Sequence, residues 1–404
     1  MRRPRPRTQT LLTVFASIAL AIFAEGRAAS SQSSGVLRLG RPVTVELEPG
    51  ASRTFTLPLR EGDFAEVSWL VKDELSVNVK VLGPGGSKVL SGPEEPDNSY
   101  SFVAQESGDY KVSLLLDKTE GVKGPQRVTL QYRDRPELPA SEPKLAHRLV
   151  NGYDVKIRGW EEQSVVTAEK GGRIKLFMRG GGGDISGFHF MDDTSEEFDE
   201  SDSRSAAFVK STRDKTGDGT PDVAVAYYSG GAHCCFTAYF IELGARVKVA
   251  AEVDGGNVPV NVVGRAPGGG LRLETADNTF AYWLVSFADS PLPSITLEFR
   301  KGELRPAPEL MRKRPPSLSK LRQEARQVRS QIGLEPYKGE EFLSFEVAFW
   351  DRMLDLLYSG NDALAWQYFD LVWPAGKQGK ALFRADFEKQ LNLSWFWRAT
   401  HPKR

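Results

Sequence analysis

The residues best suited to chemistry lie in a short aspartate-rich stretch, residues 214–222, named here the Asp loop. Calcium binds oxygen ligands at loop positions 1, 3, 5, 7 and 9, with glycine at position 6 where the backbone turns sharply. The chain fills these places with Asp214, Thr216, Asp218, the backbone carbonyl of Thr220, and Asp222, and it supplies Gly219 at the turn. Carboxylates crowded in this way repel one another unless a cation neutralises them. The Asp loop therefore predicts a Ca²⁺ site, and the alternative is an Asp-Gly turn without metal.

The residues after the Asp loop argue against a helix-loop-helix calcium sensor. Such a sensor needs a bidentate glutamate at position 12, which is Val225 here, and a helix after the loop. Residues 223–228 instead predict a buried strand that is apolar on both faces. In this form the loop resembles the calcium loops of the FG-GAP and VCBS repeat families, which it matches at Asp214, Asp218, Gly219 and Asp222 but not at Thr216. Those families repeat the loop around a propeller, and because a single copy is found, a propeller is not expected.

A second group of reactive side chains, His233, Cys234 and Cys235, follows the buried strand. The glycine pair at 230–231 predicts a hairpin that places this group one strand length, roughly 20 Å, from the Asp loop. Direct binding of the loop's ion is therefore not expected, and thiolate is a poor ligand for Ca²⁺. Together with the Asp loop, residues 229–235 resemble a group of exported bacterial proteins, and this resemblance implies no activity.

The two cysteines leave three interpretations open. Adjacent Cα atoms lie about 3.8 Å apart, so a disulfide between Cys234 and Cys235 would be strained, yet an oxidising compartment without another cysteine favours it. The cysteines can instead be reduced and pack as small apolar side chains on opposite faces of a strand. In the third interpretation, His233 and a cysteine bind a soft metal or perform redox chemistry.

Common catalytic signatures are absent from the sequence. No Gly-x-Ser-x-Gly elbow and no His-Glu-x-x-His pair occurs, and the chain has only 4 histidines. An enzyme is therefore the second hypothesis, a secreted hydrolase or thiol-dependent enzyme with its site near His233, Cys234 and Cys235. A pair of acids distant in sequence that acts on glycosides also stays open.

The first 30 residues have the order of a cleaved secretory signal peptide. Basic residues precede an apolar run at 11–24 that is too short to span a bilayer comfortably, and small residues follow at 28–30. We therefore expect export to the periplasm or the medium and a mature start near Ser31, with an uncleaved anchor as the alternative. The Arg2-Arg3 pair alone is weak support for twin-arginine export.

Composition argues against nucleic acid as a partner. The 404 residues include 53 basic and 53 acidic side chains, and residues 1–30 carry more basic than acidic ones, so the mature chain is slightly acidic. Such a chain has no positive field for nucleic acid or anionic membranes. No segment after the signal peptide is apolar enough to cross a bilayer. The 2 cysteines exclude a small disulfide-rich fold.

Residues 35–133 predict a jelly-roll β-sandwich. Short runs alternate apolar and polar residues with a period near two, at 43–47, 55–59, 77–82, 110–116 and 128–132. Trp69 is expected to pack between the sheets. The segment resembles the pre-peptidase C-terminal family at residues 62–64, 79–86 and 106–112, which implies an accessory or targeting module without catalytic residues. A linker rich in proline and charge is expected at 134–146.

The remaining chain predicts a second β-rich part and then helices. Residues 147–305 form a β-rich domain that carries the Asp loop, with strands expected at 173–178, 223–228, 236–243, 258–263 and 295–299. The acidic run at 192–202 is expected to be a solvated loop. A proline-rich linker at 306–316 precedes a small helical bundle at 317–404, where about four helices are expected. Its tryptophans are expected in the core: Trp350, Trp366, Trp373, Trp395 and Trp397.

The sequence thus predicts a mainly β protein with a C-terminal α region that is exported and binds calcium. A binding or structural role is expected, in which Ca²⁺ orders the Asp loop and its hairpin and does not activate water. The ligand, a protein or a carbohydrate, is not specified by the sequence. A subunit of an envelope assembly is a third hypothesis, and it would show an exposed aromatic patch on the C-terminal helices.

Overall fold

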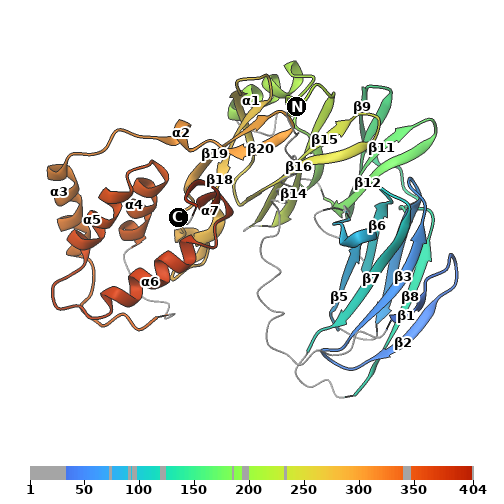
Figure 1. Ribbon diagram of the computed structural model, residues 1–404, viewed down its shortest axis with the longest axis horizontal. Helices are drawn as coiled ribbons and strands as arrows, with labels where there is room; N and C mark the ends of the chain where they lie inside the picture. The colour runs from blue at the N-terminus through green and yellow to red at the C-terminus, as the bar shows by residue number, and fades with distance from the viewer. Residues whose placement is uncertain are drawn as a thin grey trace, which may run out of the picture.

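The computed structural model describes residues 33–71, 75–89, 92, 98–118, 124–183, 186–192, 200–231, 234–339 and 347–402. The expected signal peptide and mature start lie outside these residues. The described chain is mostly β with a C-terminal helical region, as the sequence predicts (Figure 1). Its strands form five four-stranded sheets. None of the described helices is long and apolar enough to cross a membrane.

The first eight described strands form a β-sandwich. One sheet has the order β1-β3-β7-β5 and the other β2-β8-β4-β6. The strands are β1 (Ser33–Val36), β2 (Val43–Leu47), β3 (Ser52–Leu59), β4 (Phe64–Val71), β5 (Val77–Leu82), β6 (Ser99–Val103), β7 (Gly108–Leu116) and β8 (Gln126–Arg133). Alternate residues of β7, such as Val112 and Leu114, are fully buried, because successive side chains of a strand point to opposite faces. The five predicted runs are all strands, and Trp69 packs against this core partly buried.

The next twelve described strands form three sheets, with the orders β12-β11-β10-β9, β13-β14-β15-β16 and β17-β18-β19-β20. The strands of the first two are β9 (Lys144–Val150), β10 (Tyr153–Gly159), β11 (Gln163–Lys170), β12 (Arg173–Gly181), β13 (Gly187–Phe190), β14 (Asp222–Gly231), β15 (Cys234–Leu243) and β16 (Val247–Gly256). The third sheet contains β17 (Asn261–Arg265), β18 (Leu271–Ala276), β19 (Ser294–Arg300) and β20 (Glu303–Pro306). All of the neighbouring strands in these sheets are antiparallel.

The middle sheet, β13 to β16, is buried on both faces. Val225 of β14 and Ile241 of β15 belong to a core that this sheet shares with the β9–β12 sheet. Ala224 and Phe240, their neighbours in sequence, belong to a second core on the opposite face, together with Leu297 of β19. This arrangement explains why residues 223–228 are apolar at consecutive positions: a strand covered on two sides needs apolar residues on both.

The sandwich joins the β9–β12 sheet through apolar and ionic contacts. Phe64 of β4 and Phe177 of β12 pack edge to face, with ring centroids 5.0 Å apart. Beside them Glu66, 1% exposed, accepts an ion-pair contact at 3.0 Å from Arg179, 5% exposed. Arg133 contacts the second oxygen of Glu66 at 3.3 Å. The two parts are therefore fixed to each other by a buried charge pair in addition to apolar contacts.

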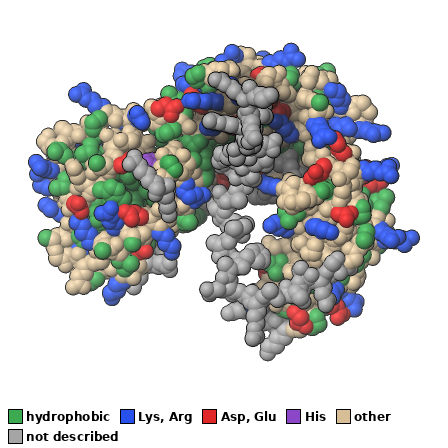
Figure 2. All heavy atoms as spheres, viewed as in Figure 1, with side chains coloured by type: hydrophobic (Ala, Val, Ile, Leu, Met, Phe, Trp, Pro, Cys, Tyr) green, Lys and Arg blue, Asp and Glu red, His purple; other side chains and the backbone are tan. Residues whose placement is uncertain are grey.

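Charged side chains are distributed over the visible surface. Figure 2 shows Lys and Arg side chains around much of the outline, with Asp and Glu side chains scattered among them.

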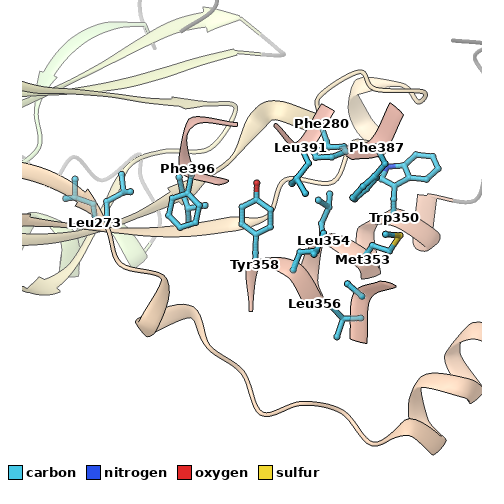
Figure 3. Packing of buried hydrophobic residues seen from close by; sticks show 14 of the residues in the cluster. Leu273, Phe280, Trp350, Met353, Leu354, Leu356, Tyr358, Phe387, Leu391 and Phe396 are labelled. Carbon is cyan, nitrogen blue, oxygen red and sulfur yellow. The ribbon is translucent and has the colours of Figure 1, made fainter. Parts of the chain in front are cut away.

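The helical region packs onto the third sheet and shares its core. The described helices are α1 (Glu200–Ser211), which lies between β13 and β14 in sequence, and then α2 (Pro308–Met311), α3 (Leu318–Arg329), α4 (Val347–Tyr358), α5 (Asp362–Val372), α6 (Lys380–Leu391) and α7 (Trp395–Thr400). Side chains from α4, α6 and α7 converge with Phe280, which follows β18, as Figure 3 shows. Ser317 and Ser394 cap α3 and α7 by accepting hydrogen bonds from backbone N–H groups.

Asp277 connects the helices to the end of β18. This residue is 6% exposed, and its Oδ2 accepts hydrogen bonds from the Tyr358 hydroxyl at 2.7 Å and from the Ser394 hydroxyl. Its Oδ1 accepts a bond from the backbone N–H of Thr279 at 3.0 Å. One buried carboxylate thus joins the third sheet to α4 and α7.

The tryptophans expected in the helical core differ in burial. Trp350 is fully buried and Trp373 is 6% exposed, whereas Trp366, Trp395 and Trp397 are partly buried against the same core. The exposed large apolar residues of the described C-terminal helices are aliphatic, with Leu382 as an example.

Several element boundaries differ from those expected. The described chain has five helices beyond Ser317, one more than predicted, because the six-residue α7 is too short to give a periodic pattern. The strand expected at 258–263 begins at Asn261, since Val258 donates to Gly255 in a turn. Part of the expected acidic loop, from Glu200, is helix α1. The 134–146 linker already contains the start of β9, and the 306–316 linker contains α2.

Candidate functional site

The Asp loop connects helix α1 to β14, and most of its side chains are held by its own backbone. Asp214 Oδ1 accepts hydrogen bonds from the N–H groups of Gly217 at 2.6 Å and Asp218 at 3.2 Å, and Asp214 Oδ2 accepts one from Gly219 at 2.7 Å. Asp218 Oδ1 accepts one from Thr220 at 2.7 Å. Gly217 and Gly219 have φ angles of 74° and 95°, a region that favours glycine. The carboxylates therefore fold the loop into a tight turn around Asp214.

Asp222 is the buried carboxylate of the loop. It is 1% exposed, and its Oδ2 accepts hydrogen bonds from the N–H groups of Lys215 at 2.7 Å and Thr216 at 2.9 Å. Its Oδ1 is buried and has no hydrogen-bond partner in the described structure. Burial, together with the charge of Asp214, raises the pKa of this carboxyl to about 6, against the lowering effect of the two backbone donors and of the Thr216 side chain. A positive partner at Oδ1 would remove this penalty.

Lys215 carries a buried positive charge beside Asp222. The residue is 7% exposed, and its Nζ donates to the backbone carbonyls of Thr212 and Asp222, both at 2.9 Å. Burial lowers the pKa of the ammonium, while the charge of Asp222 acts in the opposite direction. The lysine side chain ties the end of α1 to the start of β14. Its charge offsets part of the negative charge of the loop.

Main-chain hydrogen bonds make the Asp loop a connection between two sheets. Leu271 at the start of β18 donates to the carbonyl of Lys215 at 2.8 Å, and Gly302 donates to that of Thr216 at 3.0 Å. Leu243 at the end of β15 donates to Pro221 at 2.9 Å. The loop therefore closes the end of the layer between the middle and third sheets, and its conformation bears directly on their packing.

Close approach of the backbones depends on glycine. A Cβ at Gly270 would lie 2.6 Å from the carbonyl oxygen of Phe299 and 3.0 Å from that of Thr216. A Cβ at Gly217 would lie 2.9 Å from the nitrogen of Gly270. Real Cβ atoms do not approach so closely, so glycine lets the loop sit against the turns of the third sheet.

The donor set of the Asp loop fits a hard cation with few charged ligands. All five predicted ligands lie on this one loop, and they offer carboxylate, hydroxyl and carbonyl oxygens, which suit Ca²⁺. Among the described residues, however, no three Asp, Glu, His or Cys side chains are placed to share an ion. As the side chains stand, a cation would combine at most two carboxylates with hydroxyl, carbonyl and water oxygens. The unpartnered Oδ1 of Asp222 is the atom that fits such an ion most directly.

The hairpin residues lie at the other end of β14, one ten-residue strand from the loop, which is about 30 Å. Gly231 pairs with Cys234 in the β14–β15 register, and the hydroxyl of Ser229 accepts a bond from the N–H of Cys235 at 2.7 Å. Cys235 is disulfide-bonded and therefore has no free thiolate to act as a nucleophile. His233 and the side chain of Cys234 lie outside the described residues, so their predicted roles stay predictions.

Sequence reasoning missed two residues beside the Asp loop. Lys215 was not singled out, because a lysine in a polar loop is usually exposed. Glu242 is 2% exposed and pairs directly with Asp222 across β14 and β15. The predicted hairpin could have paired these two acids, since its turn fixes which residues lie opposite.

Comparison with known proteins gives similar solved structures over about a quarter of the chain. No protein-family model matches the chain, and no curated protein matches it. Similar solved structures include PliG of Aeromonas hydrophila, a periplasmic inhibitor of g-type lysozyme, with 13% identity and a TM-score of 0.21 over 25% of this chain and 96% of that one. PliG of Salmonella Typhimurium has 17% identity and a TM-score of 0.19 over 25% of this chain and 100% of that one.

A pre-peptidase C-terminal domain, from a Bacillus anthracis collagenase, is also among the similar structures. Its identity is 15% and its TM-score 0.21, and the match covers 27% of this chain and 100% of that one. The FG-GAP and VCBS resemblance of the Asp loop remains a prediction from sequence.

Proposed function

We propose that this chain is an exported calcium-binding protein with a binding or structural role, in which Ca²⁺ orders the Asp loop. The observation that carries the proposal is the buried Oδ1 of Asp222, which has no hydrogen-bond partner among the described residues, in a loop whose other buried side-chain polar atoms are bonded. An unpaired oxygen of a buried carboxylate is costly, and a cation is the partner that a loop of oxygen donors suits best.

The proposed role of the ion is to hold two sheets together. Backbone bonds from Leu271, Gly302 and Leu243 join the loop to the third and middle sheets. An ion that fixes the loop would stabilise those bonds, and one that leaves would loosen them. Asp214, Thr216, Asp218, the Thr220 carbonyl and Asp222 are the residues from which its ligands would come. The bound metal supplies charge neutralisation and no chemical step.

Export is supported by the signal-like first 30 residues and by the disulfide bond at Cys235. The molecular partner is proposed to be a protein or a carbohydrate. The N-terminal sandwich, as an accessory module, is the part proposed to contact it. The enzyme hypothesis at His233, Cys234 and Cys235 gains no support from the described residues.

Thermal unfolding with and without calcium tests the proposal. Ca²⁺ at 100 times its Kd should stabilise the native state by about 2.7 kcal/mol and raise Tm relative to the same protein in chelator. Asp222→Asn should remove most of that gain, because it replaces the buried carboxylate on which the proposal rests. Asp109→Ala replaces an exposed aspartate in the sandwich and should keep it. Identical melting curves of the wild-type protein in calcium and in chelator would show the proposal to be wrong.

A further inference from the structure

A second buried acid stands opposite the Asp loop. Glu242 of β15 pairs with Asp222 of β14 in the antiparallel register, so the two side chains share one face of the middle sheet. That face is the one on which Ala224 and Phe240 meet the third sheet. Glu242 is 2% exposed and Asp222 is 1% exposed. Two carboxylates are therefore removed from water at directly opposed positions.

Each of these acids has one satisfied oxygen and one unsatisfied oxygen. Glu242 Oε2 lies 2.7 Å from the Nζ of Lys248, whose side chain is 61% exposed. Asp222 Oδ2 accepts its two backbone bonds. Glu242 Oε1 and Asp222 Oδ1 are both buried and have no hydrogen-bond partner in the described structure.

A third unsatisfied oxygen belongs to the same region. The hydroxyl of Thr212 is buried without a partner. Thr212 lies beside Asp222, because the Nζ of Lys215 bonds the backbone carbonyls of both residues. Three buried oxygens without a hydrogen-bond partner in the described structure thus belong to neighbouring residues, although most buried polar atoms in native structures are paired.

Like charges directly opposite each other on neighbouring strands destabilise a sheet, and burial increases that cost. A shared proton would link the two carboxylates and leave the Thr212 hydroxyl unpaired. A divalent cation can accept all three oxygens as ligands, and calcium in particular binds carboxylate and neutral oxygens together. Neither nearby lysine pairs with the unpartnered carboxylate oxygens, since Lys215 donates to backbone carbonyls and Lys248 contacts the other oxygen of Glu242.

We propose that Glu242 is a ligand of the calcium ion of the Asp loop, supplied from the neighbouring strand together with Asp222 Oδ1 and the Thr212 hydroxyl. The inference rests on the proposed function and refines it. The Glu242 carboxylate would replace charged ligands that a calcium sensor has and this loop lacks, since Thr216 stands at loop position 3 and Val225 at position 12. It also requires only two acids, which agrees with the absence of any three-acid cluster among the described residues.

Calcium titration of metal-free protein by isothermal calorimetry tests the assignment. Glu242→Gln keeps the size of the side chain and removes its charge, and it should weaken calcium binding at least about tenfold, because affinity depends on the number of charged ligands. Glu274→Gln, at an exposed position on β18, is the matched control and should bind as the wild type does. Lys248→Met leaves both carboxylates in place and removes a competing cation, so it should bind calcium more tightly.

The outcomes separate the inference from the proposed function. If the wild type binds calcium and Asp222→Asn loses binding while Glu242→Gln binds like the wild type, Glu242 is not a ligand and the function stands. If the wild type does not bind calcium, the proposed function fails and the inference fails with it. Should Glu242→Gln not fold, Lys248→Met decides, and unchanged or weaker binding in that variant overturns the assignment.

Discussion

Replacing Arg179 should lower the free energy of unfolding, because it breaks the buried ion pair between the sandwich and the β9–β12 sheet. Arg179 and Glu66 contact at 3.0 Å with 5% and 1% exposure, so Arg179→Met leaves a carboxylate where water is excluded. Removal of one partner from a buried pair costs about 3–5 kcal/mol. Glu66 would keep Arg133 at 3.3 Å and the Ser101 hydroxyl at 3.2 Å, and we therefore expect a loss near the lower end, about 3 kcal/mol.

Urea unfolding of a double-mutant cycle measures this loss. The single variants are Arg179→Met and Glu66→Gln, and the double variant carries both changes. Because Arg179 Nε has no hydrogen-bond partner in the described structure, the pair is imperfectly satisfied. The double variant should therefore recover most of the stability, since replacing both members of a buried pair is often nearly neutral.

An exposed pair between the sandwich and β16 of the middle sheet provides the control. Lys88 contacts Glu252 at 3.0 Å, and the two side chains are 73% and 38% exposed. Lys88→Met should cost less than about 1 kcal/mol, as exposed ion pairs do. The reasoning is refuted if Arg179→Met loses no more stability than Lys88→Met, or if the double variant is as unstable as the worse single variant.

Three further predictions concern the remaining contacts. Gly270→Ala should destabilise the protein by more than about 2 kcal/mol in thermal or urea unfolding, because its Cβ would meet backbone oxygens at 2.6 and 3.0 Å, whereas Gly264→Ala has open space and should cost less than about 1 kcal/mol. Tyr358→Phe should cost about 1.5–3 kcal/mol by removing a 2.7 Å hydrogen bond to the buried Asp277 carboxylate, and a loss under about 0.5 kcal/mol would contradict that. Burial alone would raise the pKa of the Glu298 carboxyl, but two arginine partners hold this pKa below its usual value. The ionised Glu298 therefore stabilises the folded state above its unfolded pKa, and this stabilisation is lost as pH falls through the folded pKa. The stability difference between the wild type and Glu298→Gln should accordingly be larger at pH 7 than at pH 3, and a difference independent of pH would be the contrary result.

Local pattern was sufficient to predict the sandwich strands and the buried strand after the Asp loop. In β7, alternation of apolar and polar residues places Val112 and Leu114 inward, and this signal depends only on neighbours in sequence. Residues 223–228 lack alternation, and that absence correctly indicated cover on both faces. The sequence could not show which sheets provide the cover, because that depends on packing between distant segments.

The pattern of neighbouring residues in sequence could not predict helix α1 or the buried side chains of the Asp loop. Helix α1 has few apolar positions, and it is held partly by the Ser205 hydroxyl, which accepts a bond from Val262 of β17 at 2.9 Å. Lys215 can be buried because its ammonium donates hydrogen bonds to carbonyls at the end of α1 and the start of β14. Glu242 gains its importance from cross-strand pairing with Asp222. Each of these roles arises from tertiary contacts, which outweigh the usual preference of a charged residue for water.

The core common to the third sheet and the helices sets an order for folding during synthesis. Phe396, in the last helix, is 2% exposed and belongs to the same core as Leu273 of β18. The apolar surface of β18 and β19 therefore lacks its final cover until α7 has been made. A nascent chain that stops after β20 would expose this surface, and chaperones that bind apolar segments would be expected to retain it until the last helix arrives.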